Sequence, residues 1–167
     1  TLVIALNGVH AKLRKEQVVS QPRVVFHLAP EASDAPLAHL AFADSKIYTF
    51  DARSKQIVVV EPTSSVVKRL NWPDPLPPIA SSAEKTGAIF FTQDHKAYRA
   101  DPTKDAVTPL VYDSKGEGAI VAGSVYGKRL YLLDPSGNMI WRHNLGTSIG
   151  PASSYLKQTS VSLKDAV

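Results

Sequence analysis

The sequence predicts an all-β protein in which a four-stranded antiparallel unit occurs about three times. Short apolar runs, rich in β-branched and aromatic residues, alternate with turn-forming stretches, as in strands joined by tight turns. Twelve prolines and nine glycines are spread along the chain, and long helices would tolerate them poorly. Similar runs also return after about forty residues, which is a period typical of repeat architectures.

The repeat is clearest in the runs that we expect to form the second strand of each unit. These runs are Lys46–Asp51, Ala88–Gln93 and Arg129–Asp134. Aligning Tyr48, Phe90 and Tyr131 gives spacings of 42 and 41 residues. Four strands per unit of this length predict β-propeller blades, so we expect a partial β-propeller of about three four-stranded antiparallel blades.

Small residues dominate the runs that precede these second strands. The expected first strands are Leu37–Ala41, Ile79–Ala83 and Ala119–Gly123. Innermost strands crowd around a propeller's central channel, where small side chains are favoured. The third strands follow a short polar turn and are expected at Gln56–Val60, Ala97–Ala100 and Met139–Trp141.

Fourth strands are expected at Val66–Leu70 and Val107–Leu110. In the third unit, Pro135 presets φ for a turn and Gly137 can adopt a positive φ. Trp141, which follows that turn, is expected to fill the gap between neighbouring blades.

The domain organisation expected from these runs has a lead-in, three blades and a tail. Residues 1–21 form the lead-in, which contains either a hairpin at Asn7–Gly8 or a short basic helix over residues 9–17. Residues 22–167 form the propeller region, and 147–167 are a polar connector at its end. The blades are expected near 36–72, 77–112 and 117–146.

Three blades are fewer than the four to eight that typically close a propeller. An open fan leaves an apolar blade face in water, so we expect self-association or further blades supplied from outside this chain. The proline-rich stretch 71–78 connects the first two units. It either serves only as a connector or docks a partner through an exposed Trp72.

Composition excludes several function classes. The chain has no cysteine, so thiolate metal sites and cysteine nucleophiles are excluded. A net charge of +4 comes from basic residues scattered in short clusters, whereas nucleic-acid binders gather such charge on one face. We expect no nucleic-acid partner. No apolar run has the length of a membrane helix, so any membrane contact is expected through a segment outside this chain.

The sequence carries no recognisable catalytic or metal-binding spacing. Five histidines stand apart from one another and lack the spacing of zinc ligands. Aspartates fall mainly at turns, where we expect them to accept hydrogen bonds from backbone N–H groups. We therefore name no catalytic, cofactor-binding or metal residues and expect no cofactor. Residues that bind a ligand are left open.

Two parts of the sequence resemble known groups of propeller proteins. The third unit, GKRLYLLDPSGNMIWRHNLG, resembles a repeat of quinoprotein-type propellers, although the first two units lack its tryptophan and Gly-Lys pair. Residues 22–167, with PRVVFHLAP, LAHLAFADSKIYTFDARSKQIVVVEP and RLYLLDPSGNMIW, are similar to the propeller region of predicted bacterial membrane-tethered proteins. Some members of that group carry a metal-dependent protein phosphatase domain.

These resemblances imply a non-catalytic binding, sensor or scaffold module from a longer protein, with a protein or peptide partner. They imply an extracytoplasmic, membrane-tethered location and further blades after Val167. The alternatives are the regulatory propeller of a phosphatase, a fragment of a quinoprotein-like enzyme, or a module that recognises carbohydrate or peptide at the channel mouth. No phosphatase metal-binding motif can be placed on this chain, so that activity is not transferred to it.

Overall fold

The computed structural model describes residues 3–5, 24–27, 37–155 and 162–164 of the chain. Within these ranges the protein is all-β and contains no helix. The part of the chain that is described therefore has no helix able to span a membrane. Three four-stranded antiparallel sheets make up most of the fold, which confirms the predicted fold class.

Each sheet is a simple up-and-down meander in chain order. The first sheet contains β3 (Leu37–Ala43), β4 (Lys46–Asp51), β5 (Gln56–Glu61) and β6 (Val66–Asn71). The second contains β7 (Pro78–Ala83), β8 (Ala88–Thr92), β9 (Ala97–Asp101) and β10 (Ala106–Leu110). The third contains β11 (Ala122–Tyr126), β12 (Arg129–Asp134), β13 (Met139–Asn144) and β14 (Ser153–Ser154).

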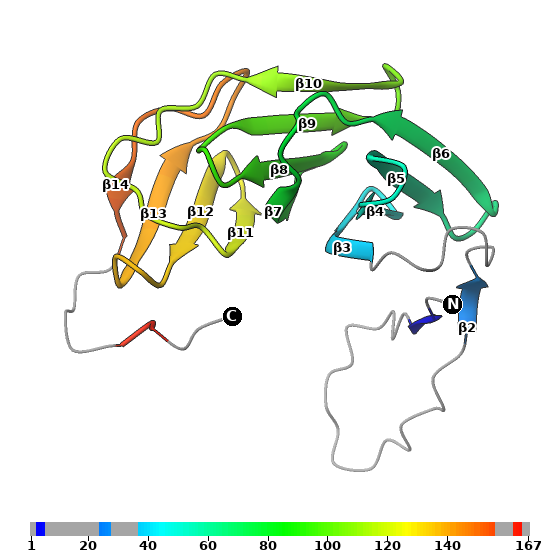
Figure 1. The fold of residues 1–167 in the computed structure, drawn as a ribbon, viewed down its shortest axis with the longest axis horizontal. Helices are drawn as coiled ribbons and strands as arrows, with labels where there is room; N and C mark the ends of the chain where they lie inside the picture. The colour runs from blue at the N-terminus through cyan, green and yellow to red at the C-terminus, as the bar shows by residue number, and fades with distance from the viewer. Residues whose placement is uncertain (1–2, 6–23, 28–36, 156–161, 165–167) are drawn as a thin grey trace, which may run out of the picture.

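The three sheets stand side by side in an arc, as blades of a partial propeller (Figure 1). The first strands β3, β7 and β11 lie on the inside of the arc and contact one another in sequence order. The fourth strands β6, β10 and β14 lie on the outside. Neighbouring sheets therefore face each other, and side chains between them are removed from water.

Two hydrophobic clusters fill the two gaps between sheets. Tyr48, Phe50 and Phe90 belong to the cluster between the first and second sheets. Phe91 and Leu132 belong to the cluster between the second and third sheets. Burying one such side chain stabilises a fold by roughly 1.5–3 kcal/mol, so these two clusters hold the sheets together.

The predicted equivalence of Phe90 with Tyr48 and Tyr131 is wrong by one residue. Tyr48 and Tyr131 each lie three residues before the last residue of their strand, and the residue at that position in β8 is Ile89. Ile89 packs toward the third sheet, whereas Phe90 packs toward the first. Because alternate strand residues point to opposite faces, the one-residue shift places the Phe90 ring on the other side of the sheet.

The third sheet differs from expectation at both of its edges. Its first strand is β11, which begins about three residues after the predicted Ala119. Its fourth strand, β14, falls inside the segment 147–167 that was expected to be a connector. β14 pairs with β13 through Trp141–Ser154 and Arg142–Ser153, so this segment supplies the fourth strand.

The chain before the first sheet contributes one strand pair. β1 (Val3–Ala5) pairs antiparallel with β2 (Val24–His27). The predicted Asn7–Gly8 turn and its helical alternative over residues 9–17 lie outside the described residues.

Trp72 is not an exposed anchor, which excludes one of the two roles considered for the connector 71–78. Its side chain is 8% exposed and its ring makes edge contacts with Phe50, Phe90 and Tyr98. The indole Nε1 donates a hydrogen bond to the Leu76 carbonyl at 2.8 Å. The connector 71–78 thus folds its tryptophan into the gap between the first two sheets.

Candidate functional site

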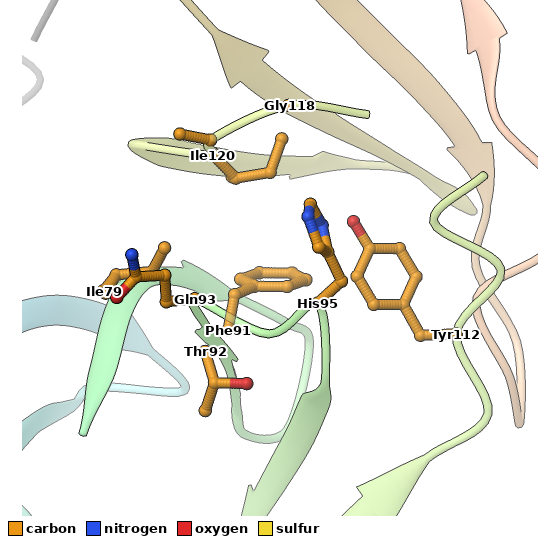
Figure 2. Close-up of a pocket in the computed structure, with 9 residues that line it drawn as sticks. Ile79, Phe91, Thr92, Gln93, His95, Tyr112, Gly118 and Ile120 are labelled. Atoms are coloured by element: carbon orange, nitrogen blue, oxygen red, sulfur yellow. The ribbon is translucent and has the colours of Figure 1, made fainter. Parts of the chain in front are cut away.

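A pocket of about 230 Å³ lies between the second and third sheets (Figure 2). Phe91 and Ile120 form its apolar walls, and Tyr112 closes one side. Gln93 and His95 bring polar groups to it from the turn between β8 and β9. The remaining lining residues are Ile79, Thr92, Gly118 and Ala119. The pocket thus combines aromatic and aliphatic surface with two polar side chains.

The β8–β9 turn fixes the polar side of this pocket. Thr92 Oγ1 donates to Asp94 at 2.5 Å and accepts from the Lys96 N–H at 3.2 Å. His95 donates its backbone N–H to the Thr92 carbonyl at 3.1 Å and has a φ of +58°. These bonds hold the turn in one conformation. Among the described residues, neither the Gln93 amide nor the His95 imidazole has a hydrogen-bond partner.

Tyr112 is held in the pocket wall by a buried polar cluster. Its ring makes edge contacts with Phe91 at 5.8 Å and with His143 at 5.7 Å between centroids. Its hydroxyl donates a short hydrogen bond to Glu117. Burial and the Glu117 carboxylate both raise the pKa of Tyr112. The phenol therefore stays neutral and serves as a fixed wall.

His143 completes that cluster behind the wall. Its Nε2 lies 2.9 Å from Glu117 Oε1, and both side chains are fully buried. The contact is an ion pair when His143 is protonated, and its geometry is not that of a hydrogen bond. His143 Nδ1 lies 2.7 Å from the Gly150 carbonyl. Burial alone would lower the pKa of His143, but Glu117 and the Gly150 carbonyl outweigh burial and raise it.

Asp134 fixes the segment 118–120, which forms one wall of the pocket. Its carboxylate accepts hydrogen bonds from the backbone N–H groups of Gly118 and Gly137, each at 2.8 Å, and from Trp141 Nε1 at 3.1 Å. Burial would raise the pKa of Asp134, but these bonds and one from Ser136 hold it below its ordinary value. A Cβ at Gly118 would lie 2.3 Å from Ser136 Oγ, so glycine is required for this close approach.

A second depression, of about 250 Å³, lies between the first and second sheets. Its charged groups are already paired. Lys46 lies 3.8 Å from Glu61. Lys68 lies 3.3 Å from Asp105 and donates to the Pro102 carbonyl at 2.9 Å. We therefore take the pocket at Gln93 and His95 as the candidate binding site.

The histidines and aspartates considered as candidate site residues lie at separate places in the structure. Within the described ranges, no three His, Asp or Glu side chains gather in a group able to hold a metal ion. His95 lies at the pocket and His143 lies behind its wall, whereas His10 falls outside the described residues. Turn aspartates cap backbone N–H groups as predicted, for example Asp51 to Arg53 and Asp101 to Thr103. Trp141 packs against the cluster between the second and third sheets, as expected.

Sequence reasoning missed Gln93, Tyr112 and Glu117 as members of a site. Gln93 and Tyr112 line the same pocket from opposite sides of Phe91 and His95 (Figure 2). The turn residues carry no distinctive spacing in the sequence, so only the three-dimensional arrangement reveals them.

No protein-family model and no curated protein matches the chain. Solved structures do match, and they are β-propeller proteins. One is a nidogen/laminin complex, with a TM-score of 0.57 and 16% identity over 80% of this chain and 51% of that chain. YCF48 from Cyanidioschyzon merolae matches with a TM-score of 0.57 and 11% identity over 76% of this chain and 42% of that one.

An enzyme shares the same architecture. A catalytically inactive virginiamycin B lyase from Staphylococcus aureus with quinupristin matches with a TM-score of 0.50 and 14% identity. The match covers 74% of this chain and 42% of that one. This chain therefore spans about half or less of the length of these structures. The likeness establishes the fold, a partial β-propeller.

Proposed function

We propose that this chain is a non-catalytic binding module that holds a peptide segment of a partner protein. The observation that carries the proposal is the pocket at Gln93 and His95, where two unpaired polar side chains border an aromatic and aliphatic cavity. Pockets for drug-sized ligands span about 300–1,000 Å³. A cavity of about 230 Å³ suits one apolar side chain of a peptide better than a large cofactor.

Recognition of such a peptide would use both parts of the pocket. Phe91, Tyr112 and Ile120 would surround an aliphatic or aromatic side chain. The Gln93 amide can donate to and accept from peptide main-chain groups, and His95 can do one of each when neutral. Two related propellers have protein or peptide ligands in their structures, a nidogen/laminin complex and YCF48 bound to D1 peptide, which supports a polypeptide ligand here.

The finer roles expected from the sequence stay predictions. They are a sensor or scaffold role, membrane tethering, a phosphatase-linked regulatory role and a quinoprotein-like origin. None of the described contacts bears on them, and the peptide-binding proposal does not depend on them.

The test is selection of binders from a random linear-peptide library displayed on phage, followed by titration of the selected peptide. We expect enrichment of peptides with an apolar side chain. Gln93→Ala and His95→Asn should each weaken binding roughly fivefold, the equivalent of one neutral hydrogen bond. Asparagine tolerates the positive φ of His95, so this variant keeps the turn.

The matched control is Lys55→Asn, which changes an exposed residue with a φ of +52° in the equivalent turn of the first sheet. This variant should bind as the wild type does. Equal loss in Lys55→Asn and His95→Asn, or failure of any peptide to bind, would contradict the proposal.

A further inference from the structure

One side of the pocket is formed by the segment between β10 and β11, residues 111–121. Tyr112, Gly118, Ala119 and Ile120 line the pocket and all belong to this segment. In the view of Figure 2, Gly118 and Ile120 lie above the Phe91 ring and Tyr112 lies beside it. The other lining residues come from the second sheet. The shape of the pocket therefore depends on how firmly the 111–121 segment is held.

His143 of β13 holds this segment from behind. Its Nε2 lies 2.9 Å from Glu117 Oε1, and its Nδ1 lies 2.7 Å from the Gly150 carbonyl oxygen. Glu117 in turn accepts a hydrogen bond from the Tyr112 hydroxyl. Tyr112 also forms a β-bridge with Ile149, in the loop between β13 and β14. The imidazole thus joins β13 to both the 111–121 segment and this loop.

The geometry of the cluster requires a proton between His143 and Glu117. A carbonyl oxygen only accepts hydrogen bonds, so the contact with Gly150 places a proton on Nδ1. Without a further proton, the Nε2 lone pair faces a carboxylate oxygen at 2.9 Å, where both side chains are fully buried. Neither atom can then donate to the other, and buried polar atoms without a donor are costly. One proton, carried by Nε2 or by the carboxyl group, removes this conflict.

The charged groups around His143 favour its protonated form. Burial would lower the pKa of His143, but its contacts with Glu117 and the Gly150 carbonyl and the nearby charge of Asp113 raise it. On the facing second sheet, Arg99 is held in an ion pair with a glutamate of its own sheet at 2.6 Å. The proton that the geometry requires is therefore also favoured by the electrostatics.

The gap between the first and second sheets holds its equivalent aromatic residue differently. Trp72 packs against Phe50 at 5.8 Å between centroids, and Tyr112 packs against Phe91 at the same distance. The Trp72 indole, however, donates its hydrogen bond to a backbone carbonyl, which does not titrate. The proton-dependent contact thus distinguishes the gap that contains the candidate pocket.

We propose that peptide binding at the pocket is linked to the proton held between His143 and Glu117, so that the pocket binds its ligand less tightly when this proton is lost. The inference rests on the proposed function, because it concerns regulation of the same pocket. With the proton in place, the imidazole fixes the segment that presents Tyr112 and Ile120. Its loss leaves two buried acceptors facing each other and releases that segment. By linkage, the peptide-bound protein must then hold the proton more tightly than the free protein.

Calorimetric titration of the phage-selected peptide, in buffers of different ionisation enthalpy, counts the protons taken up on binding. We expect the wild type to take up as much as one proton at pH values above about 6.5. Its dissociation constant should rise roughly fivefold as pH increases over this range, the equivalent of one hydrogen bond. His143→Gln should abolish the proton uptake. Glu117→Gln should reduce it, because the imidazole loses its anionic partner.

Two control variants assign the titrating group. His95→Asn removes the histidine that lines the pocket, and it should keep the proton uptake although its binding is weaker. Glu84→Gln is the matched control for Glu117→Gln, because it neutralises a carboxylate that is 13% exposed and paired with Arg99. Arginine stays charged throughout this pH range. Glu84→Gln should therefore show the proton uptake of the wild type.

The outcomes separate this inference from the proposed function. Peptide binding by the wild type without proton uptake, and with an affinity independent of pH, would overturn the inference and leave the proposed function standing. Uptake that persists in His143→Gln, or that disappears in His95→Asn, would overturn it as well. Failure to select any peptide would contradict the proposed function itself.

A measurement on the wild type covers the case in which circular dichroism shows that the His143 and Glu117 variants do not fold. The imidazole of His143 is titrated by nuclear magnetic resonance with and without the selected peptide. The peptide should move the midpoint of this titration to higher pH. An unchanged midpoint would overturn the inference.

Discussion

The first and third sheets stand at opposite ends of the same arc but differ in how they end it (Figure 1). In the first sheet, β4 and β5 are buried on both faces, and Ile47, Val58 and Val60 are each 1% exposed. In the third sheet, burial alternates along β12, so Leu130 and Leu132 are buried while Tyr131 and Leu133 are only half-buried. Among the described residues, β4 and β5 are thus more completely buried than β12.

The contrast extends to individual positions. Val60 pairs with Ile47 in the first sheet, and the equivalent residue in the third sheet is His143, which pairs with Leu130. The first sheet thus has an apolar side chain where the third has a buried ionisable one. The buried His143–Glu117 pair therefore has no counterpart at the Val60–Ile47 position of the first sheet.

The largest expected difference between the two ends of the arc is in the unfolding free energy lost when each of the two tryptophans is replaced. Trp72→Ala removes a side chain that is 8% exposed and contacts three aromatic rings, and we expect it to cost about 3–5 kcal/mol of unfolding free energy. Trp141 is half-buried, so Trp141→Ala should cost roughly half as much. Urea denaturation followed by circular dichroism measures both values.

Equal costs for the two variants would mean that the third sheet is packed as tightly as the first. A larger cost for Trp141→Ala would reverse the comparison. Trp141→Phe serves as the control that retains an aromatic ring but loses the hydrogen bond to Asp134.

Local patterns predicted most of the fold. Turns and alternating apolar runs locate hairpins because both depend on residues close in sequence. Predictions from local pattern failed where the pattern is weak or the partner is distant. β14 consists of two serines and has no apolar signal. Phe90 was aligned by its aromatic ring, although register assigns that position to Ile89.

The candidate site was beyond the reach of such reasoning. Gln93 and His95 look like ordinary turn residues, and they meet Tyr112 and Ile120 only when two sheets pack together. Of the two roles considered for the connector, docking through an exposed Trp72 is excluded because the ring is buried and its indole bonds to the Leu76 carbonyl. The pocket could not be predicted because its lining residues come from segments that are far apart in the sequence.

Equivalent aspartates at the ends of β4 and β12 provide a second test. Asp51 accepts hydrogen bonds from Arg53 and Ser54 of its own turn and from the half-exposed Arg69. Asp134, by contrast, accepts from three parts of the third unit, at Gly118, Gly137 and Trp141. Asparagine retains a single acceptor oxygen and leaves buried donors unpaired. We expect Asp134→Asn to cost about 1–3 kcal/mol and Asp51→Asn less, as measured by urea denaturation.

Asp134 should also contribute more than Asp51 to the loss of folding stability at acidic pH. The folded-state pKa of Asp134 lies below its ordinary value, so its contribution is present above the unfolded pKa of about 3.9. That contribution is lost as pH falls through the folded-state pKa. Asp134→Asn should flatten the loss of stability below about pH 4. An unchanged acid limb in this variant would show that Asp134 is not the group responsible.

The smallest expected effect is the pH dependence that His143 gives to the third sheet. Its folded-state pKa is raised, so the stability it contributes is fully present below its unfolded pKa of about 6.5. That stability is lost as pH rises through the folded-state pKa. His143→Gln should therefore remove part of the decline in the urea midpoint as pH rises above about 6.5, and Glu117→Gln should do the same by removing the charge partner.

Hydrogen exchange locates this effect within the fold. Because Val60 occupies the equivalent place in the first sheet, amides of β4 and β5 should keep their protection at alkaline pH after correction for the intrinsic exchange rate. Amides of β12 and β13 should lose protection in the wild type but not in His143→Gln. A uniform loss of amide protection across all three sheets would show that the His143–Glu117 pair affects global unfolding. The first and third sheets would then not differ in local stability.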